Sequence, residues 1–193
     1  MENLISIVIG AIFINNIVLT KFLGLCPFFG VSTKISNALS MGGAVTFVMT
    51  FSSIITWLVY DQLLIPFNIE YLRLVAFILV IATFVQLSET IIKNTAPKIH
   101  QSLGVYLPLI TTNCAILGIV LINNIQQSYT LLSSTISGAA TGAGFTLALL
   151  LMAGIRERLA LANSPESLRG LPLAFIAAAL LALAFQAFSG MSI

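Results

Sequence analysis

The hydrophobic positions of the chain fall into six long runs that are separated by short polar connections. The runs cover about residues 4–24, 38–60, 72–92, 103–124, 131–155 and 171–190. A bilayer core of about 30 Å needs about 20 apolar residues per helix, and each run supplies roughly that number. The pattern therefore predicts an all-α integral membrane protein with six transmembrane helices, in a single membrane domain over residues 1–193.

Two of the six runs predict interrupted helices. The first apolar stretch continues to about residue 31, too long for one simple span, and Cys26-Pro27 is expected to end a helix there. In the fourth run, the polar residues 111–113 precede Cys114. Prolines and polar residues inside a span free backbone groups that must find partners within the protein. We therefore expect both cysteines to lie at helix breaks, where the two thiols approach one another near the middle of the membrane.

Spacings between matching features predict an internal repeat. Cys26 matches Cys114 at an offset of 88 (114 − 26). The second and fifth runs both open on small residues, at 41–43 and 138–140, and are offset by about 93 (131 − 38). A three-helix unit that occurs twice places its second copy upside down, because three is odd. The prediction is two inverted repeats, about 1–97 and 98–193; six unrelated spans of similar length are the alternative.

The composition supports a membrane protein. Hydrophobic residues make up 59% of the chain and charged residues 7%, against roughly a quarter charged in soluble domains. The formal net charge of +2 is too small to indicate a nucleic-acid partner. The sequence Met1-Glu2-Asn3 carries no basic residue, so the first run is expected to remain as a span. The lone histidine, His100, is expected in a solvated connection.

Basic residues gather on one side of the predicted membrane. With six spans the connections alternate sides, and only Arg73 falls at the second connection. The other seven of the eight basic residues fall at the first, third and fifth connections: Lys21, Lys34, Lys93, Lys98, Arg156, Arg158 and Arg169. Because basic loops stay inside, we expect both termini on the non-cytoplasmic side of the membrane.

The residues alone leave three interpretations of Cys26 and Cys114 open. Each could be a small buried hydrophobic side chain, as most buried free cysteines are. They could form a disulfide, or they could bind a metal, for which soft thiolates favour zinc or iron–sulfur chemistry. An iron–sulfur cluster takes four cysteines, and this chain has two. Such a cluster would therefore need two more cysteines from a second chain.

Three other features carry weaker predictions. Glu89 stands four residues before Lys93, the favourable order for a helical ion pair near the interface. Asn15-Asn16 in the first run is expected to make a hydrogen bond between helices, with an ion path as the alternative. Residues 138–144 form a small-residue face for close helix packing.

The polar sequence RERLALANSPESLRG, residues 156–170, is the longest predicted connection. Its basic start, Arg156-Glu157-Arg158, is expected to anchor the orientation of the fifth span. A docking surface for a cytoplasmic redox protein is the alternative.

Several segments together resemble a known family. These are VLTKFLGLCPFFGVSTK, LRLVAFILVIATFVQLSE, LPLITTNCAILG, AGIRERLA and LRGLP. They resemble the Rnf–Nqr membrane subunits over essentially the whole chain. The segment TKFLGLCPF is closer to the RnfA branch of this family than to the paralogous NqrE branch, which belongs to the Na⁺-translocating NADH:quinone reductase.

The resemblance implies a function and a cofactor. It implies a membrane component of an ion-translocating ferredoxin:NAD⁺ oxidoreductase (Rnf) complex that relays electrons and is coupled to Na⁺ or H⁺ movement. It also implies that Cys26 and Cys114 supply two of the four cysteine ligands of a [2Fe–2S] cluster. The other two ligands would come from RnfE, a homologous six-helix protein inserted in the opposite orientation. RnfB, RnfC, RnfD and RnfG are the further implied partners. The alternatives are the NqrE component of the quinone reductase, or a secondary transporter without a redox centre, which inverted repeats and broken helices also allow.

Overall fold

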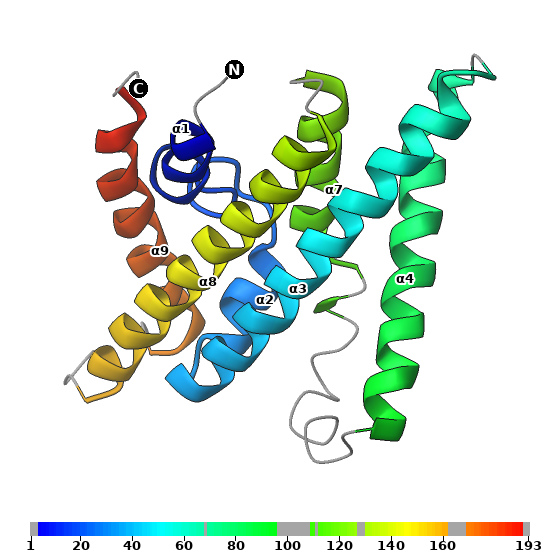
Figure 1. Cartoon of the computed structure of the whole chain (residues 1–193). Helices are drawn as coiled ribbons and strands as arrows, with labels where there is room; N and C mark the ends of the chain where they lie inside the picture. The colour runs from blue at the N-terminus through cyan, green and yellow to red at the C-terminus, as the bar shows by residue number, and fades with distance from the viewer. Residues whose placement is uncertain are drawn as a thin grey trace.

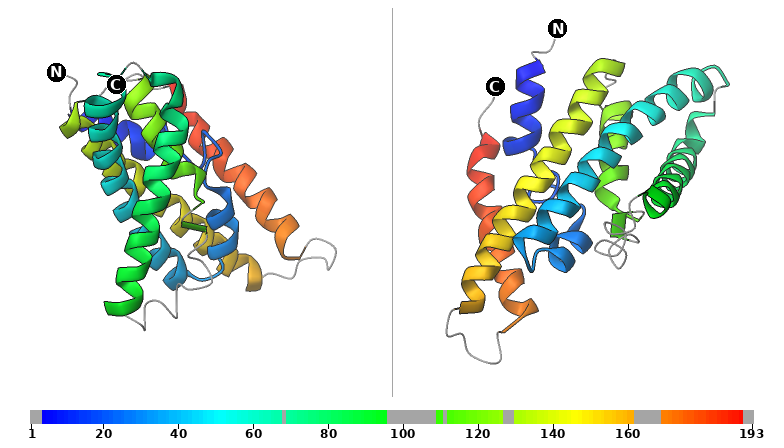
Figure 2. Two further views of the ribbon diagram at one scale, coloured as in Figure 1. Left: turned by 90° about the vertical axis from the view of Figure 1, so that its right-hand side faces the viewer. Right: turned by 60° about the horizontal axis from the view of Figure 1, so that its bottom comes forward.

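The computed structural model describes residues 4–67, 69–95, 109–110, 112–126, 130–161 and 169–190, and these form helices and turns. The elements are α1 (Leu4–Ile9), η1 (Gly10–Ile14), α2 (Leu25–Val31), α3 (Ile35–Val59), η2 (Tyr60–Leu64), η3 (Glu70–Leu72), α4 (Arg73–Thr95), α7 (Cys114–Leu121), η4 (Ile122–Gln126), α8 (Leu131–Leu161), α9 (Leu171–Gln186) and η6 (Ala187–Gly190). Both ends of the chain lie at the same end of the molecule (Figures 1 and 2).

Two long helices form the centre of the described structure. Helix α3 continues through η2 as one helix of 30 residues, Ile35–Leu64, and α8 has 31 residues. At 1.5 Å per residue each is roughly 45 Å long, more than the ~30 Å core of a bilayer, so each can cross it tilted. They run side by side and diagonally in Figure 1. Both are long and apolar enough to cross a membrane; the apolar helices at 4–14, 73–87, 114–124 and 171–186 are shorter.

Small residues bring α3 and α8 into close contact. A Cβ added at Gly42 would lie 2.6 Å from Thr146 Oγ1, and one added at Gly142 would lie 2.7 Å from the backbone Cα of Thr46. The two threonine hydroxyl oxygens are 3.2 Å apart. The helices are antiparallel, since the start of α3 meets the end of α8, where the N–H of Ile35 donates to an oxygen of Glu157. The predicted small-residue packing face is therefore confirmed.

The buried positions of α3 and α8 recur at one spacing. Eight of the nine buried residues of α3 fall on buried residues of α8 when 100 is added to their numbers, from Ala38 and Gly138 to Ser53 and Ala153. This spacing of 100 differs from the offset of about 93 between the predicted starts of the two runs. The close approach places Gly42 against Thr146 and Gly142 against Thr46.

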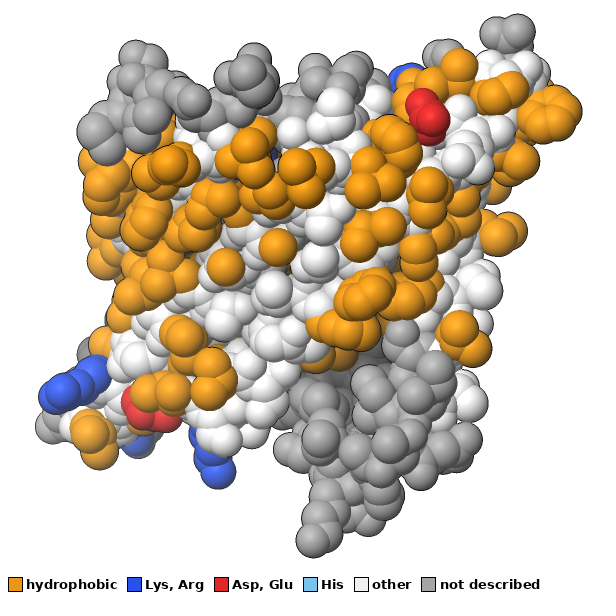
Figure 3. Space-filling view, in the orientation of Figure 1, with side chains coloured by type: hydrophobic (Ala, Val, Ile, Leu, Met, Phe, Trp, Pro, Cys, Tyr) orange, Lys and Arg blue, Asp and Glu red, His pale blue; other side chains and the backbone are white. Residues whose placement is uncertain are grey.

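The outside of the molecule is apolar. Large aliphatic and aromatic side chains are exposed on every long helix described, among them Phe47, Leu79 and Leu180. Figure 3 shows them spread across the middle of one face, with charged side chains at its ends. A soluble monomer rarely exposes such a continuous apolar surface, so this surface fits contact with lipid or with other membrane helices.

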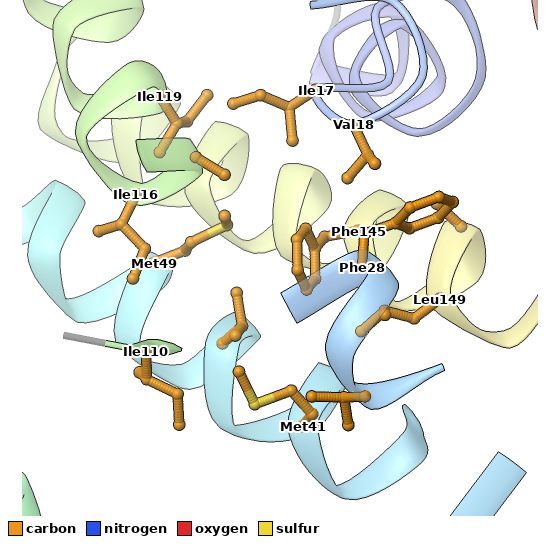
Figure 4. Packing of buried hydrophobic residues seen from close by; sticks show 14 of the residues in the cluster. Ile17, Val18, Phe28, Met41, Met49, Ile110, Ile116, Ile119, Phe145 and Leu149 are labelled. Atoms are coloured by element: carbon orange, nitrogen blue, oxygen red, sulfur yellow. The ribbon is translucent and has the colours of Figure 1, made fainter. Parts of the chain in front are cut away.

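Apolar side chains from several helices meet between α2, α3, α7 and α8. Figure 4 shows Phe28, Met49, Ile116, Phe145 and Leu149 converging there. Helix α4 joins this core through one stripe, Phe77, Ile81 and Val85, spaced four residues apart as expected for one face of a helix.

Polar side chains are buried between the helices and are mostly bonded. Asn123, at 0% exposure, donates to the carbonyl of Ser134 and accepts from the hydroxyl of Ser137. In lipid, backbone and side-chain polar groups need such internal partners. This arrangement ties η4 to the first turns of α8.

The first predicted span is interrupted earlier than expected. Its helix ends at Ile14 instead of continuing to residue 24. Asn16 accounts for the break: its Nδ2 donates to the carbonyl of Gly144 in α8 at 2.9 Å, and its Oδ1 accepts from the N–H of Val18. These bonds replace the regular helical ladder. The predicted interhelical role is confirmed for Asn16, whereas Asn15 is exposed.

Charged residues mark the two ends of the molecule. Lys34, Arg158 and Arg169 lie exposed where α3 begins, α8 ends and α9 begins, and Asp61 and Arg73 lie at the opposite end. Helix α8 continues to Leu161, so the first residues of the predicted connection 156–170 are helical, a correction to its expected start.

Candidate functional site at the two cysteines

Cys26 is the second residue of a helix. Gly24 precedes α2 with φ 77°, a left-handed conformation that glycine adopts at little cost, and turns the chain into the helix. The expectation that Cys26-Pro27 ends a helix is wrong. The first four N–H groups of a helix have no intrahelical acceptor, so Pro27 in the first turn of α2 loses no hydrogen bond.

Cys114 is the first residue of α7. Asn113 precedes it in an extended conformation, and its Oδ1 accepts a hydrogen bond from the N–H of Ala115 at 3.0 Å. This is the usual role of asparagine at a helix N-cap. The break predicted before Cys114 is confirmed at residues 112–113; residue 111 lies outside the described residues.

The structure brings the two cysteine segments together. The N–H of Gly24 donates a hydrogen bond to Cys114 Sγ at 3.0 Å, which places Cys114 beside a residue that is two positions along the chain from Cys26. Gly24 is tightly enclosed: an added Cβ would lie 2.9 Å from Phe145 and 3.1 Å from Asn113 Oδ1. Nearby, Phe22 has φ 56°, a left-handed conformation that costs a non-glycine residue about 1–2 kcal/mol. Such strain is typical of functional loops.

Both thiols are free and exposed. Neither side chain is buried within this chain, and no disulfide joins the two. The described residues contain no group of three or more His, Cys, Asp or Glu that could hold a metal ion. The described part of this chain therefore presents two free thiols at its surface.

The local electrostatics favour an anionic group beside the thiols. Both cysteines lie in the first turn of a helix, where the helix dipole stabilises negative charge. Asn113 adds a further donor, since its Nδ2 is buried and has no hydrogen-bond partner among the described residues. Buried donors are rarely left unpaired. Thiolates or an anionic cofactor would thus meet positive dipole ends here.

The glycine that follows each cysteine by four residues lies against a leucine from the other segment. A Cβ added at Gly118 would lie 2.5 Å from Leu23 Cδ1, and one added at Gly30 would lie 3.6 Å from Leu109 Cδ1. The first distance is far too short and the second is an ordinary contact. The spacing that the two cysteine motifs share therefore serves the packing of the site, most strictly at Gly118.

We predict that Gly118→Ala destabilises the protein and Gly30→Ala does not. The new methyl group at position 118 forces the side chain of Leu23 to move. Because the nearest atom is the end of a flexible side chain, the cost lies at the low end of the overpacking range, about 1 kcal/mol, or roughly 2–4 °C in unfolding midpoint. Gly30→Ala gains helix propensity without a clash. Thermal unfolding of the purified protein checks both. Equal midpoints for the two variants would contradict the packing described here.

The remaining candidates lie away from the two cysteines or outside the described residues. Glu89 lies within α4, and the side chain of Lys93 is outside the described part, so their pairing stays a prediction. His100 and Lys98 are also outside it. Gly24 and Asn113 were not predicted as site residues. Only their position next to the cysteine motifs could have pointed to them.

The fold and this site define a helical membrane protein that presents two free thiols at neighbouring helix starts. The family model described as "Rnf-Nqr subunit, membrane protein" matches residues 4–192. The chain belongs to the Rnf-Nqr family of membrane proteins.

Curated relatives match over nearly their whole length. The A subunit of the ion-translocating oxidoreductase complex of Syntrophotalea carbinolica is 53% identical over 191 residues, 99% of this chain and 98% of the relative. The A subunit of the Na⁺-translocating ferredoxin:NAD⁺ oxidoreductase complex of Acetobacterium woodii is 53% identical over 190 residues, 98% of each chain. The A subunit of the ion-translocating oxidoreductase complex of Azoarcus sp. is 49% identical over 192 residues, all of this chain and 99% of the relative.

Proposed function

We propose that this chain is the RnfA component of an ion-translocating ferredoxin:NAD⁺ oxidoreductase complex. The observation that carries the proposal is 53% identity, over 98–99% of the chain, to the corresponding components of two such complexes. The chain would act as one membrane component of a translocase, together with the homologous protein RnfE and with RnfB, RnfC, RnfD and RnfG. It would not hold a complete active site alone.

Within that complex, the proposed architecture is two inverted three-helix repeats, about residues 1–97 and 98–193. Three observations support it. Helices α3 and α8 are antiparallel, their buried residues correspond at an offset of 100, and Gly42–Thr146 and Gly142–Thr46 are reciprocal contacts. Reciprocal pairs of this kind are what a two-fold axis between two copies of one unit produces. Inverted repeats commonly place their site on interrupted helices at the repeat interface.

The proposed cofactor is a [2Fe–2S] cluster with two ligands from Cys26 and Cys114 and two from RnfE. The chain fits this group in three respects: the thiols are exposed, both lie at helix starts, and Cys114 Sγ already accepts an N–H hydrogen bond from Gly24. Hydrogen bonds to sulfur and the surrounding charge set the reduction potential of such clusters. When bound, the cluster would supply one-electron transfer within the membrane.

This chain's own residues would hold and surround that group. The helix starts present their positive dipole ends to its negative charge, and the N–H of Gly24 and the amide of Asn113 offer donors beside Cys114. The buried apolar side chains Phe145 and Ala115, next to Gly24, keep water away from this side. The low polarity behind the thiols strengthens each of these interactions.

The proposed orientation has both termini on the non-cytoplasmic side of a bacterial cytoplasmic membrane. Lys34, Arg158 and Arg169 are exposed at the end of the molecule opposite the termini. Basic residues are retained on the cytoplasmic side, which supports this assignment.

The experiment that tests the function compares this chain and its homologous partner, purified separately and together. We expect iron, acid-labile sulfide and an EPR signal on reduction in the co-purified pair only, because neither chain alone supplies four cysteine ligands. A full signal from this chain alone would contradict the shared site. A pair without iron or sulfide after anaerobic purification would exclude the cluster.

A further inference from the structure

A basic cavity lies at the end of the molecule opposite the chain termini, between the end of α8, the start of α9 and the turn before α3. Its volume is about 320 Å³, similar to the smaller ligand sites of proteins. Its lining residues are Thr33, Arg156, Leu159, Ala160, Arg169, Gly170, Leu173 and Ala174. We propose that this cavity binds the anionic phosphate headgroup of a membrane phospholipid.

Arg156 gives the cavity a fixed cation. Its Nη1 donates to the carbonyl of Phe29 at 2.7 Å and to the hydroxyl of Ser32 at 3.0 Å. These bonds join α8 to α2 and hold the guanidinium in one place. Within the described part of the chain, both bonds use Nη1. The three N–H donors of Nη2 and Nε therefore remain available. A guanidinium held in this way can donate two parallel hydrogen bonds to a phosphate.

Arg169 and the start of α9 add positive potential. Arg169 is exposed and directly precedes Gly170, which has φ 90° and turns the chain into α9. The helix has 16 residues and no acidic residue in its first turn. Its dipole therefore favours an anion at the side where Gly170 and Leu173 line the cavity.

The cavity lining contains no carboxylate among the described residues. Glu157 is adjacent in sequence, but it is exposed and accepts the N–H of Ile35 at the start of α3. Among the described residues, the lining therefore carries two arginines and no acid, which gives this part of the cavity positive charge. This charge selects an anion over a zwitterion or a cation.

The position of the cavity favours a lipid over a soluble anion. Four of its lining residues are apolar, and the neighbouring α9 side chains Leu171, Phe175 and Ile176 are exposed. Figure 3 shows that charged side chains at this end border the apolar surface, as they do where headgroups meet acyl chains. Basic pockets between transmembrane helices at the cytoplasmic face bind anionic headgroups. A free phosphate would use the arginines but not the apolar wall.

The test uses the complete complex purified in mild detergent, with bound lipids counted by native mass spectrometry. Arg169→Gln is the main variant, because no described bond ties Arg169 to the fold, whereas Arg156→Gln also removes the bonds to α2. Arg158→Gln is the matched control: it removes an exposed arginine of the same end of the molecule that does not line the cavity. After delipidation, each protein is titrated with phosphatidylglycerol, phosphatidylcholine or inorganic phosphate.

We expect wild type and Arg158→Gln to bind phosphatidylglycerol alike and in preference to phosphatidylcholine. Arg169→Gln should bind it about fivefold more weakly, the usual effect of one basic residue near a membrane surface. Equal affinity in Arg169→Gln and wild type would overturn the proposal, and so would an equal loss in Arg158→Gln. If millimolar inorganic phosphate displaces the lipid completely, the cavity is a site for a free anion and the lipid proposal is wrong.

Discussion

Replacing either Cys26 or Cys114 by serine is expected to remove two irons and two acid-labile sulfides per complex and to abolish the EPR signal of that cluster. Serine has nearly the size of cysteine, so the helix starts at Gly24 and Asn113 can form as before. Its hydroxyl is a much poorer ligand for iron than a thiolate, because soft sulfur ligands suit iron–sulfur chemistry. Since each cysteine would supply a quarter of the ligands, loss of one is expected to be as complete as loss of both. Iron and sulfide analysis and EPR of the reduced complex measure the effect.

The control for the cysteine variants is Gly30→Ala in the same short helix as Cys26. A Cβ at that position meets only Leu109 Cδ1 at an ordinary distance, so cluster content and assembly should equal those of wild type. The serine variants should still assemble with the partner protein, as judged by size-exclusion chromatography. If either serine variant keeps the full iron and sulfide content, that cysteine is not a ligand.

The helical membrane fold could be predicted from the sequence because lipid imposes strong constraints. A span must be apolar over about 20 residues and must satisfy its own backbone. The two longest helices follow this rule closely: the runs predicted at 38–60 and 131–155 lie within Ile35–Leu64 and Leu131–Leu161. The ends extend further because polar residues such as Asp61 and Arg156 can continue a helix beyond the hydrocarbon.

Whether a helix ends or begins at Cys26 could not be predicted from the local sequence pattern. Proline marks either the end of a helix or its first turn, and sequence alone does not distinguish the two. The outcome depends on Gly24, whose left-handed conformation lets the chain enter α2. It also depends on Asn16, which ends the preceding helix by bonding to Gly144, 128 residues away.

The candidate site was predicted in its main residues and missed in its supporting ones. Cys26 and Cys114 stood out because the chain has two cysteines in similar settings. The roles of Gly24 and Asn113 arise only where the two segments meet, through the bond from Gly24 to Cys114 and the tight space around Gly24. Contacts between residues 90 apart leave no local signal in a single sequence.

Gly142→Ala is expected to be the most destabilising of the glycine substitutions in the central helix pair. Helices in lipid gain little from burying apolar surface against each other, so close backbone approach at small residues supplies much of their association. A Cβ at Gly142 would lie 2.7 Å from the Cα of Thr46. Backbone cannot rotate away as a side chain can, so the two helices must separate and lose contacts along the crossing. We expect a loss of about 3 kcal/mol, the upper part of the range for overpacking.

Two matched variants make this prediction specific to the crossing. At Gly43, one residue along from the contact, an added Cβ meets nothing within 4 Å, so Gly43→Ala should leave the unfolding midpoint unchanged or raise it slightly. At Gly42 the added Cβ meets side-chain atoms of Thr146, which can move in part, so Gly42→Ala should fall between the other two. Thermal unfolding of the purified complex in one detergent gives the order. A Gly142→Ala midpoint equal to that of Gly43→Ala would mean that α3 and α8 do not cross at these residues, and the reciprocal contacts that support the inverted repeat would lose their basis.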